Sequence, residues 1–283
     1  MYFHEELPAG ALTLGADISC QSIHKMCGSL TQSSMLHLNS DKIDRNKLKF
    51  NLQMFQNTSP SYLLEVSLDL ARHNMAMHGY EILGKILEIS NYARTKISGI
   101  KGFEVLGKEI IGQAAIFDYE PIRLIISGRQ LGIEGYELYE MLRYKYNIEM
   151  EFGDYFYGIC TMGIGNTKED VDRLISAVKD ISEKYEGQRT PLEWDEELPP
   201  LPPQVMTPRQ AYAAKTKRIS WGELKGKISA EMIVPYPPGI PTICPGEIIT
   251  KDVWEFLDEQ SKAGRHLHGP ENGILNTISI VDE

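Results

Sequence analysis

Residues 22–37 carry the most informative pattern in the chain, which reads Ser22-Ile23-His24-Lys25-Met26-Cys27-Gly28-Ser29-Leu30-Thr31-Gln32-Ser33-Ser34-Met35-Leu36-His37. A histidine directly precedes Lys25, a serine stands three positions before it, and further hydroxyl groups follow at residues 31–34. A lysine amine that bonds to an aldehyde cofactor needs such groups nearby to hold the cofactor's phosphate. A lysine taken alone is far more often a surface residue, so the neighbours carry the prediction: Lys25 is the candidate catalytic residue, and Ser22 and His24 are candidate binding residues.

The composition is that of an ordinary globular protein, because 42% of the 283 residues are hydrophobic and 24% are charged. The formal net charge of −10 argues against nucleic acid as a partner, since phosphate binding requires clustered Lys and Arg. The sequence has neither a secretory signal nor an apolar run of about 18 residues that could cross a bilayer. The four cysteines form no C-x-x-C pair and indicate a reducing compartment. We therefore expect a cytoplasmic protein with no membrane and no nucleic-acid partner.

The first third of the chain is predicted to place two short strands around the lysine and then to become helical. Apolar spacing predicts a helix from about Arg45, followed by one helix over residues 61–73 and another over residues 80–98. The last of these has a clear apolar stripe and is expected to bridge two domains.

From residue 99 the pattern alternates between strands and helices, which predicts a small α+β unit that ends near residue 189. Its elements are expected at residues 122–126, 136–146, 148–152, 155–161 and 168–185. Residues 190–208 contain six prolines and predict an extended linker. Residues 209–283 form a last segment with its own strands and a helix from Lys251 to about Gly264.

Residues 22–37 resemble the cofactor-lysine motif of the arginine/lysine/ornithine decarboxylases, Ser-x-His-Lys followed by Thr-Gln-x-Ser-x-Leu-His. Residues 57–62, which read Asn57-Thr58-Ser59-Pro60-Ser61-Tyr62, are similar to that family's Thr-Thr-Ser-Pro-x-Tyr segment, with Asn57 in place of the first Thr. Residues 226–241 and the following Pro245-Gly246-Glu247 look like its C-terminal signature. The resemblance therefore covers the whole chain.

This resemblance implies an α/β fold: the C-terminal part of a large domain of the aspartate-aminotransferase type (fold type I), followed by α+β small and C-terminal domains. Residues 1–98 would belong to the cofactor-binding large domain and residues 99–189 to the small domain. Residues 190–208 would be the Pro-rich linker, and residues 209–283 the C-terminal decarboxylase domain.

The resemblance also implies pyridoxal 5′-phosphate (PLP) as cofactor, attached at Lys25. Ser22, His24, Thr58 and Ser59 would bind it, the last two reaching the phosphate across a dimer interface. Members of the family form homodimers, so a homo-oligomer of at least two chains is expected.

Part of the family's site would lie outside this chain. The aspartate that pairs with the cofactor's pyridine nitrogen, and the phosphate-binding loop, precede the segment that Tyr2–Pro8 matches. Asp17 is too near Lys25 in sequence to replace that aspartate. The chain is therefore expected to be the C-terminal part of such a decarboxylase, and to be weak or inactive when it is alone.

The implied reaction converts a basic amino acid (arginine, lysine or ornithine) to its amine and CO₂, in polyamine biosynthesis or acid-stress metabolism, with arginine or lysine favoured. Glu231 has two open interpretations, a carboxylate for the distal cation of the substrate or an exposed charge at the end of a strand. No metal site is expected, because His266 and His268 have no third ligand.

Two alternatives to a complete enzyme remain open. The chain could be a non-catalytic truncated product, or one half of a split decarboxylase that needs an N-terminal partner to supply the missing carboxylate and phosphate loop. Another enzyme of the same fold type, such as an aminotransferase, is a further possibility that the signature at residues 235–241 argues against.

Overall fold

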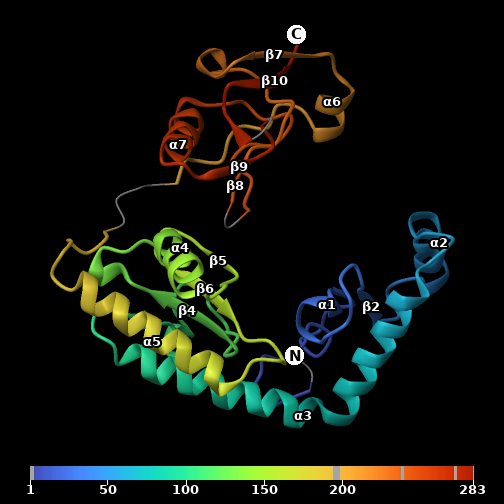
Figure 1. Cartoon of the computed structure of the whole chain (residues 1–283). Coiled ribbons are helices and arrows are strands. Elements are labelled where there is room, and N and C mark those ends of the chain that lie inside the picture. Colours follow the sequence, from blue (N-terminus) through green and yellow to red (C-terminus); the bar gives the residue numbers. More distant parts are fainter. Residues whose placement is uncertain (1–2, 194–197, 237–238, 271–272, 283) are drawn as a thin grey trace. The chain divides into compact units, whose positions relative to one another are not determined.

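The computed structural model divides the chain into two units, Met1–Leu192 (unit 1) and Glu193–Glu283 (unit 2) (Figure 1). It describes residues 3–193, 198–236, 239–270 and 273–282. Tyr2, part of the predicted linker and the central prolines of the predicted C-terminal signature, Pro237 and Pro238, lie outside the described residues. Each unit contains both helices and strands, so the predicted mixed α/β character is confirmed. The finer division of residues 1–189 into two domains stays a prediction.

Unit 1 begins with the segment that carries Lys25. The strands β1 (Ile18–Gln21) and β2 (Met35–Leu38) pair antiparallel, with the short helix α1 (Ile23–Met26) between them in the chain. The prediction of two short strands around the lysine is therefore confirmed. Helix α2 (Arg45–Phe55) follows, and it begins where predicted because the Asp44 carboxylate accepts hydrogen bonds from the first free backbone amides.

One helix, α3 (Tyr62–Ser98), replaces the two helices predicted over residues 61–98. The predicted interruption is wrong. Gly79 lies inside the helix, where a Cβ atom would approach the side chain of Phe3 to 3.1 Å. The glycine therefore allows close packing of the N-terminal segment against the helix instead of ending it.

The second half of α3 packs on a four-stranded antiparallel sheet, whose order is β3-β4-β6-β5. The elements of this part of unit 1 are β3 (Glu104–Val105), η1 (Lys108–Ile110), β4 (Arg123–Ser127), η2 (Arg129–Leu131), α4 (Gly135–Tyr146), β5 (Phe152–Gly153), β6 (Gly158–Thr161) and α5 (Lys168–Tyr185). Thr167 and Asp170 form a capping box that starts α5 at the predicted position. Helices α3 and α5 run side by side (Figure 1), and the Tyr92 hydroxyl donates a hydrogen bond of 2.8 Å to Asp172.

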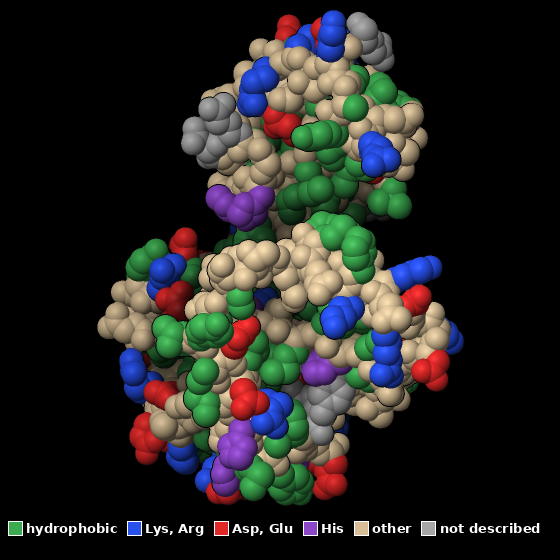
Figure 2. All heavy atoms as spheres, turned by 90° about the vertical axis from the view of Figure 1, so that its right-hand side faces the viewer, with side chains coloured by type: hydrophobic (Ala, Val, Ile, Leu, Met, Phe, Trp, Pro, Cys, Tyr) green, Lys and Arg blue, Asp and Glu red, His purple; other side chains and the backbone are tan. Residues whose placement is uncertain are grey.

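The core of unit 1 lies between this sheet and its helices. Leu124 and Ile126 of β4, Leu83 and Ile97 of α3, and Leu138 of α4 are fully or almost fully buried in it. The other end of unit 1 differs, because hydrophobic side chains of α2 and of the first half of α3 are exposed. Figure 2 views unit 1 from this side and shows hydrophobic side chains at the surface among charged ones.

Cys160 of β6 lies in the core, and its burial raises the pKa of the thiol to about 12. The thiolate is the reactive form, so burial disfavours reaction at Cys160 both by raising its pKa and by shielding the sulfur from reagents. Cys20 of β1, by contrast, is exposed. We expect iodoacetamide at pH 8 to modify Cys20 within minutes and to leave Cys160 unmodified until the protein unfolds, as read by mass spectrometry. Equal labelling of the two cysteines in the folded chain would contradict this packing.

Unit 2 has its own core, formed by residues such as Ile233, Val253 and Ile278. Two antiparallel strand pairs, β7–β10 and β8–β9, surround it together with helix α7. The elements are α6 (Pro208–Ala213), β7 (Thr216–Ser220), η3 (Trp221–Glu223), β8 (Val234–Tyr236), α7 (Lys251–Lys262), β9 (His266–His268) and β10 (Thr277–Val281). The end of the predicted linker is held on this unit, because the Val205 amide donates to the Gly246 carbonyl at 2.9 Å. Across the described residues, no helix is long and apolar enough to span a membrane.

Candidate active site

Lys25 lies on α1, a single helical turn in the connection between β1 and β2. The two ends of this connection are held together by the strand pairing, in which Gln21 lies opposite Met35. Its backbone amide donates to the Ser22 carbonyl at 3.2 Å, which starts the turn. The side chain is exposed, and its ammonium makes no hydrogen bond or ion pair with any described residue. The end of the Lys25 side chain is therefore open to solvent.

The neighbouring imidazole is fixed by the loop that follows α1. His24 is half-buried, and its Nδ1 donates a hydrogen bond of 2.7 Å to the carbonyl oxygen of Ser33. Because the acceptor is a carbonyl, the proton is assigned to Nδ1, and Nε2 is left for another partner. His24 is thus oriented by the backbone of the hydroxyl-rich stretch that the sequence pattern singled out.

Two buried serines hold this loop in shape. The hydroxyls of Ser29 and Ser33 lie 2.6 Å apart, and the Ser33 hydroxyl donates to the Leu30 carbonyl at 2.5 Å. The Leu30 amide in turn donates to the Ser67 hydroxyl of α3 at 3.2 Å, which joins the loop to the long helix. Neither Ser29 nor Ser67 was a candidate in the sequence, because a serine that supports a loop has no spacing signal of its own.

Thr58 and Ser59 lie in the connection between α2 and α3, and both are exposed. The Ser59 amide donates to the side chain of Asn57 at 3.0 Å, which shapes the connection as a turn. Within the described part of the chain, no hydrogen bond joins Thr58 or Ser59 to the residues around Lys25. Their role as phosphate ligands stays a prediction.

Glu231 belongs to unit 2 and already has partners there. Its Oε1 accepts hydrogen bonds from the backbone amide and hydroxyl of Ser279, and it pairs with the Arg218 guanidinium at 3.1 Å. Its Oε2 is buried without a hydrogen-bond partner among the described residues. These contacts give Glu231 a structural task in unit 2, and a role toward substrate stays a prediction.

The groups around Lys25 fit a cofactor that combines an aldehyde with a phosphate. They include the primary amine of Lys25 and the imidazole of His24, whose Nδ1 is bonded to Ser33 and whose Nε2 has no hydrogen-bond partner among the described residues. The exposed hydroxyls of Ser22, Thr31 and Ser34 complete the set. Asp17 is the carboxylate nearest to Lys25 in sequence. Its carboxylate forms an ion pair with Lys42, whose Nζ lies 3.4 Å from Oδ1. A hydrogen bond from Ser40 and the charge of Lys42 lower the pKa of Asp17. The residues thus fit attachment and phosphate contacts, whereas a carboxylate for the pyridine nitrogen is not identified among them.

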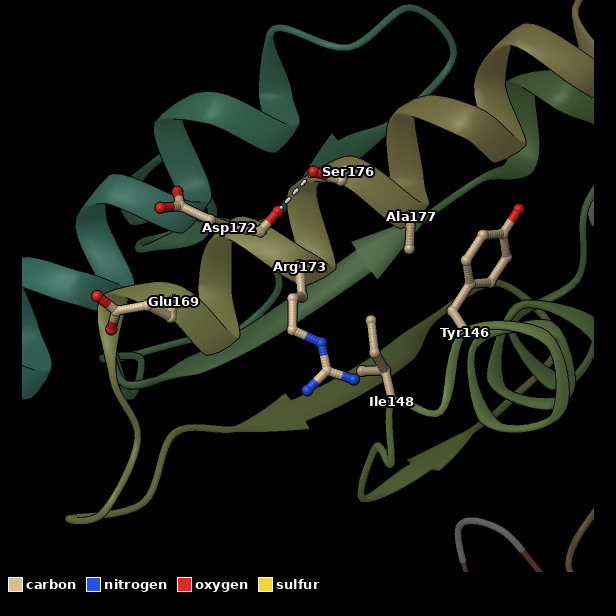
Figure 3. A pocket seen from close by; sticks show the side chains of 7 residues that line it. All are labelled: Tyr146, Ile148, Glu169, Asp172, Arg173, Ser176 and Ala177. Atoms are coloured by element: carbon tan, nitrogen blue, oxygen red, sulfur yellow. Dashed lines mark hydrogen bonds between the residues drawn. The ribbon is translucent and has the colours of Figure 1, made fainter.

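A pocket of about 470 Å³ lies elsewhere, between α5 and the end of α4. Figure 3 shows its lining residues, among them Arg173 of α5 and Ile148 after α4. It contains no predicted site residue. No group of three or more His, Cys, Asp or Glu side chains suited to a metal ion occurs within the described ranges.

Comparison with known proteins supports the resemblance over both units. Residues 1–170 match the model of the Orn/Lys/Arg decarboxylase major domain, and residues 194–275 match that of the Orn/Lys/Arg decarboxylase C-terminal domain. The chain is 38% identical over 284 residues to the arginine decarboxylase of Bacillus subtilis (strain 168), covering 100% of this chain and 58% of that protein. It is 37% identical over 286 residues to the arginine decarboxylase of Halalkalibacterium halodurans, with the same coverage of 100% and 58%.

Solved structures support the same fold. The lysine decarboxylase of Francisella novicida aligns with a TM-score of 0.79 at 23% identity, covering 94% of this chain and 49% of that chain. The constitutive lysine decarboxylase of E. coli aligns with a TM-score of 0.75 at 19% identity, with the same coverage. This chain spans 58% of the length of the two arginine decarboxylases, and both of its units match that family. The protein is therefore a member of the Orn/Lys/Arg decarboxylase family.

Proposed function

We propose that this chain supplies the cofactor lysine of a PLP-dependent decarboxylase that converts a basic amino acid to its amine and CO₂. The observation that carries the proposal is the exposed amine of Lys25 on α1, which has no partner among the described residues and lies beside an imidazole that the Ser33 carbonyl holds in place. Arginine is the proposed substrate, because relatives that cover the whole of this chain are named arginine decarboxylases.

PLP, when bound, supplies the electron sink that accepts the electron pair left on Cα as CO₂ departs. Lys25 would hold the cofactor through its Nζ. Its Nζ would then hold a proton for return to Cα, which is the task of a general acid. The Nε2 of His24 and the hydroxyl of Ser22 would bind the cofactor beside Lys25, and Thr58 and Ser59 would reach the phosphate from a second chain of a homodimer.

For the distal cation of the substrate we propose the carboxylate of Glu231. Its Oε2 has no hydrogen-bond partner among the described residues. Because Oε2 is buried and Arg218 already pairs with Oε1, a guanidinium could bind there only if this part of unit 2 rearranged. Replacing Glu231 with glutamine would then raise the KM for arginine more than it lowers kcat.

The alternative proposal is that the chain is one half of a split enzyme, or a non-catalytic product. Asp17, the carboxylate nearest to Lys25 in sequence, already pairs with Lys42 and is not free for the pyridine nitrogen. This pairing favours a chain that needs a second polypeptide to supply that carboxylate.

Release of labelled CO₂ from carboxyl-labelled arginine, lysine and ornithine tests the function. We expect little or no release by the chain alone. When the chain is co-expressed with the part of the Bacillus subtilis arginine decarboxylase that has no counterpart in it, we expect release with arginine as the preferred substrate. No release from any of the three amino acids by the assembled and PLP-loaded complex would contradict the proposal.

A further inference from the structure

Two histidine side chains lie next to each other on β9, on one face of the β8–β9 strand pair. Successive side chains of a strand point to opposite faces, so His266 and His268 share one face and Leu267 lies on the other. Leu267 is buried in the core of unit 2, whereas both histidines are exposed. Figure 2 shows histidine side chains at the surface of unit 2. Both imidazoles are therefore open to a solute.

The ring nitrogens of this pair are not used by the fold of unit 2. Neither imidazole forms a hydrogen bond or an ion pair with a described residue. The rings instead contact each other, with centroids 4.6 Å apart and planes at 88°, and His268 meets the ring of Tyr236 at 5.1 Å. His24 of unit 1 differs, because the Ser33 carbonyl already binds its Nδ1. The nitrogens of His266 and His268 are thus available to an external partner.

The separation of the two rings suits two ligands of one metal ion. An imidazole nitrogen binds a metal at ~2.0–2.1 Å, which places the ion about 3.2 Å from the ring centroid when it lies in the ring plane. Two imidazoles at a right angle on one ion then have centroids about 4.5 Å apart, and two at the tetrahedral angle about 5.2 Å apart. The observed distance of 4.6 Å is closer to the first value. Right-angled nitrogen ligation is typical of the square-planar or tetragonal sites of Cu²⁺ and Ni²⁺.

The backbone holds the two imidazoles in place. Strand β9 pairs with β8, so that Tyr236 lies opposite His266. Directly after His268 the chain turns at Gly269, whose φ is +108°, and a Cβ atom at this position would collide with the carbonyl oxygen of Met232. Only glycine permits so close an approach, which fixes the end of β9 against the rest of unit 2. Because the backbone of both ligands is already ordered, little further ordering is needed when an ion binds.

We propose that His266 and His268 form a two-ligand site for a divalent transition-metal ion, with Cu²⁺ bound most tightly. Imidazole is a preferred ligand of copper, nickel and zinc, and among these divalent ions Cu²⁺ has the highest affinity for a given nitrogen site. The described residues supply no third His, Cys, Asp or Glu ligand, so water fills the other coordination positions. A structural zinc site would need four protein ligands. The pair therefore forms an open and reversible site, not a metal centre on which folding depends.

Substitution of either histidine tests whether the two act together. Once one imidazole has bound the ion, the other is held beside it, so His266→Gln and His268→Gln should each weaken Cu²⁺ binding about 100-fold. Both side chains are exposed, so circular dichroism of the variants should be unchanged. The matched control is the double variant His73→Gln/His78→Gln, which also removes two exposed histidines. These lie five residues apart on α3, a spacing that does not place them on one face, so the control should bind Cu²⁺ like the original chain.

The experiment titrates the full chain with Cu²⁺, without an affinity tag, without PLP and after iodoacetamide has blocked the exposed thiol of Cys20. We expect the first equivalent of Cu²⁺ to broaden the amide NMR signals of residues 234–236 and 266–268 before any others. Electron paramagnetic resonance of the same sample should show two imidazole nitrogens on the ion. Ni²⁺ and Zn²⁺ should bind the same residues more weakly. Because PLP is omitted, the result does not depend on the role of Lys25.

Three results would overturn the proposal. The first is broadening by the first equivalent of Cu²⁺ that begins at another histidine or at the start of the chain. The second is a His266→Gln/His268→Gln double variant that binds the first equivalent as tightly as the original chain. The third is an affinity of the original chain no higher than that of the two single variants, which would show adventitious binding to separate imidazoles.

Discussion

Replacing Lys25 with alanine should abolish covalent retention of PLP and lower the decarboxylation rate of the assembled enzyme by at least about 10²–10⁴-fold, the contribution of a positioned acid or base. The reason is that Lys25 is the exposed amine beside His24, and alanine can neither bond to an aldehyde nor carry a proton to Cα. Labelled CO₂ release and PLP absorbance after exhaustive dialysis would measure the two effects.

Two further variants complete this prediction. Lys25→Arg keeps the positive charge but should be as inactive as the alanine variant, because a guanidinium stays protonated and is not a nucleophile at neutral pH. Lys42→Ala removes another exposed lysine, which pairs with Asp17, and should retain both cofactor and activity. If Lys25→Ala kept its PLP and its rate, the proposed role of Lys25 would be wrong.

Replacing Gly135 with alanine should destabilise unit 1 by at least about 3 kcal/mol, the upper range for overpacking a closed site. A Cβ atom at Gly135 would lie 2.1 Å from the carbonyl oxygen of Tyr157 and 2.5 Å from that of Asp154. Both obstacles are backbone atoms, so no side chain can move aside. The start of α4 is held at this place by the Tyr136 amide, which donates to the Asp154 carbonyl at 2.9 Å.

Urea unfolding, followed by circular dichroism, measures this effect. Gly165→Ala is the matched control in the same unit, because a Cβ atom at that position meets nothing within 4 Å. Its free energy of unfolding should stay within about 0.5 kcal/mol of the original, as for an ordinary surface substitution. Equal stabilities of the two variants would show that α4 does not approach the β5–β6 connection as closely as described.

The sequence predicted local elements well wherever a local signal exists. The strands around Lys25 are bounded by turn residues, and α5 begins at the capping box of Thr167. The break predicted between residues 73 and 80 is wrong, because α3 is continuous there, and the packing of Gly79 against Phe3 depends on a residue that is distant in sequence. A glycine that ends a helix and one that permits close packing look the same in a single sequence.

The candidate site was predictable only in part, and for a similar reason. The spacing of Ser22, His24 and Lys25 is a local motif on one helical turn, so the pattern could identify it. The contact of His24 with the Ser33 carbonyl, and the pairing of Glu231 with Arg218, depend on tertiary structure. The sequence likewise could not predict that no hydrophobic side chain among residues 8–70 is buried, because exposed and buried apolar residues can have the same spacing along the chain.

The most direct test of the account is to mix the purified chain, alone and in complex with its proposed partner, with PLP and to reduce the mixture with borohydride. Peptide mapping by mass spectrometry then locates the reduced adduct. We predict a single dominant adduct on the peptide that contains Lys25, at least in the complex, with little on exposed lysines such as Lys42 or Lys85. Adducts spread evenly over the surface lysines of the complex, with no preference for Lys25, would contradict the central claim.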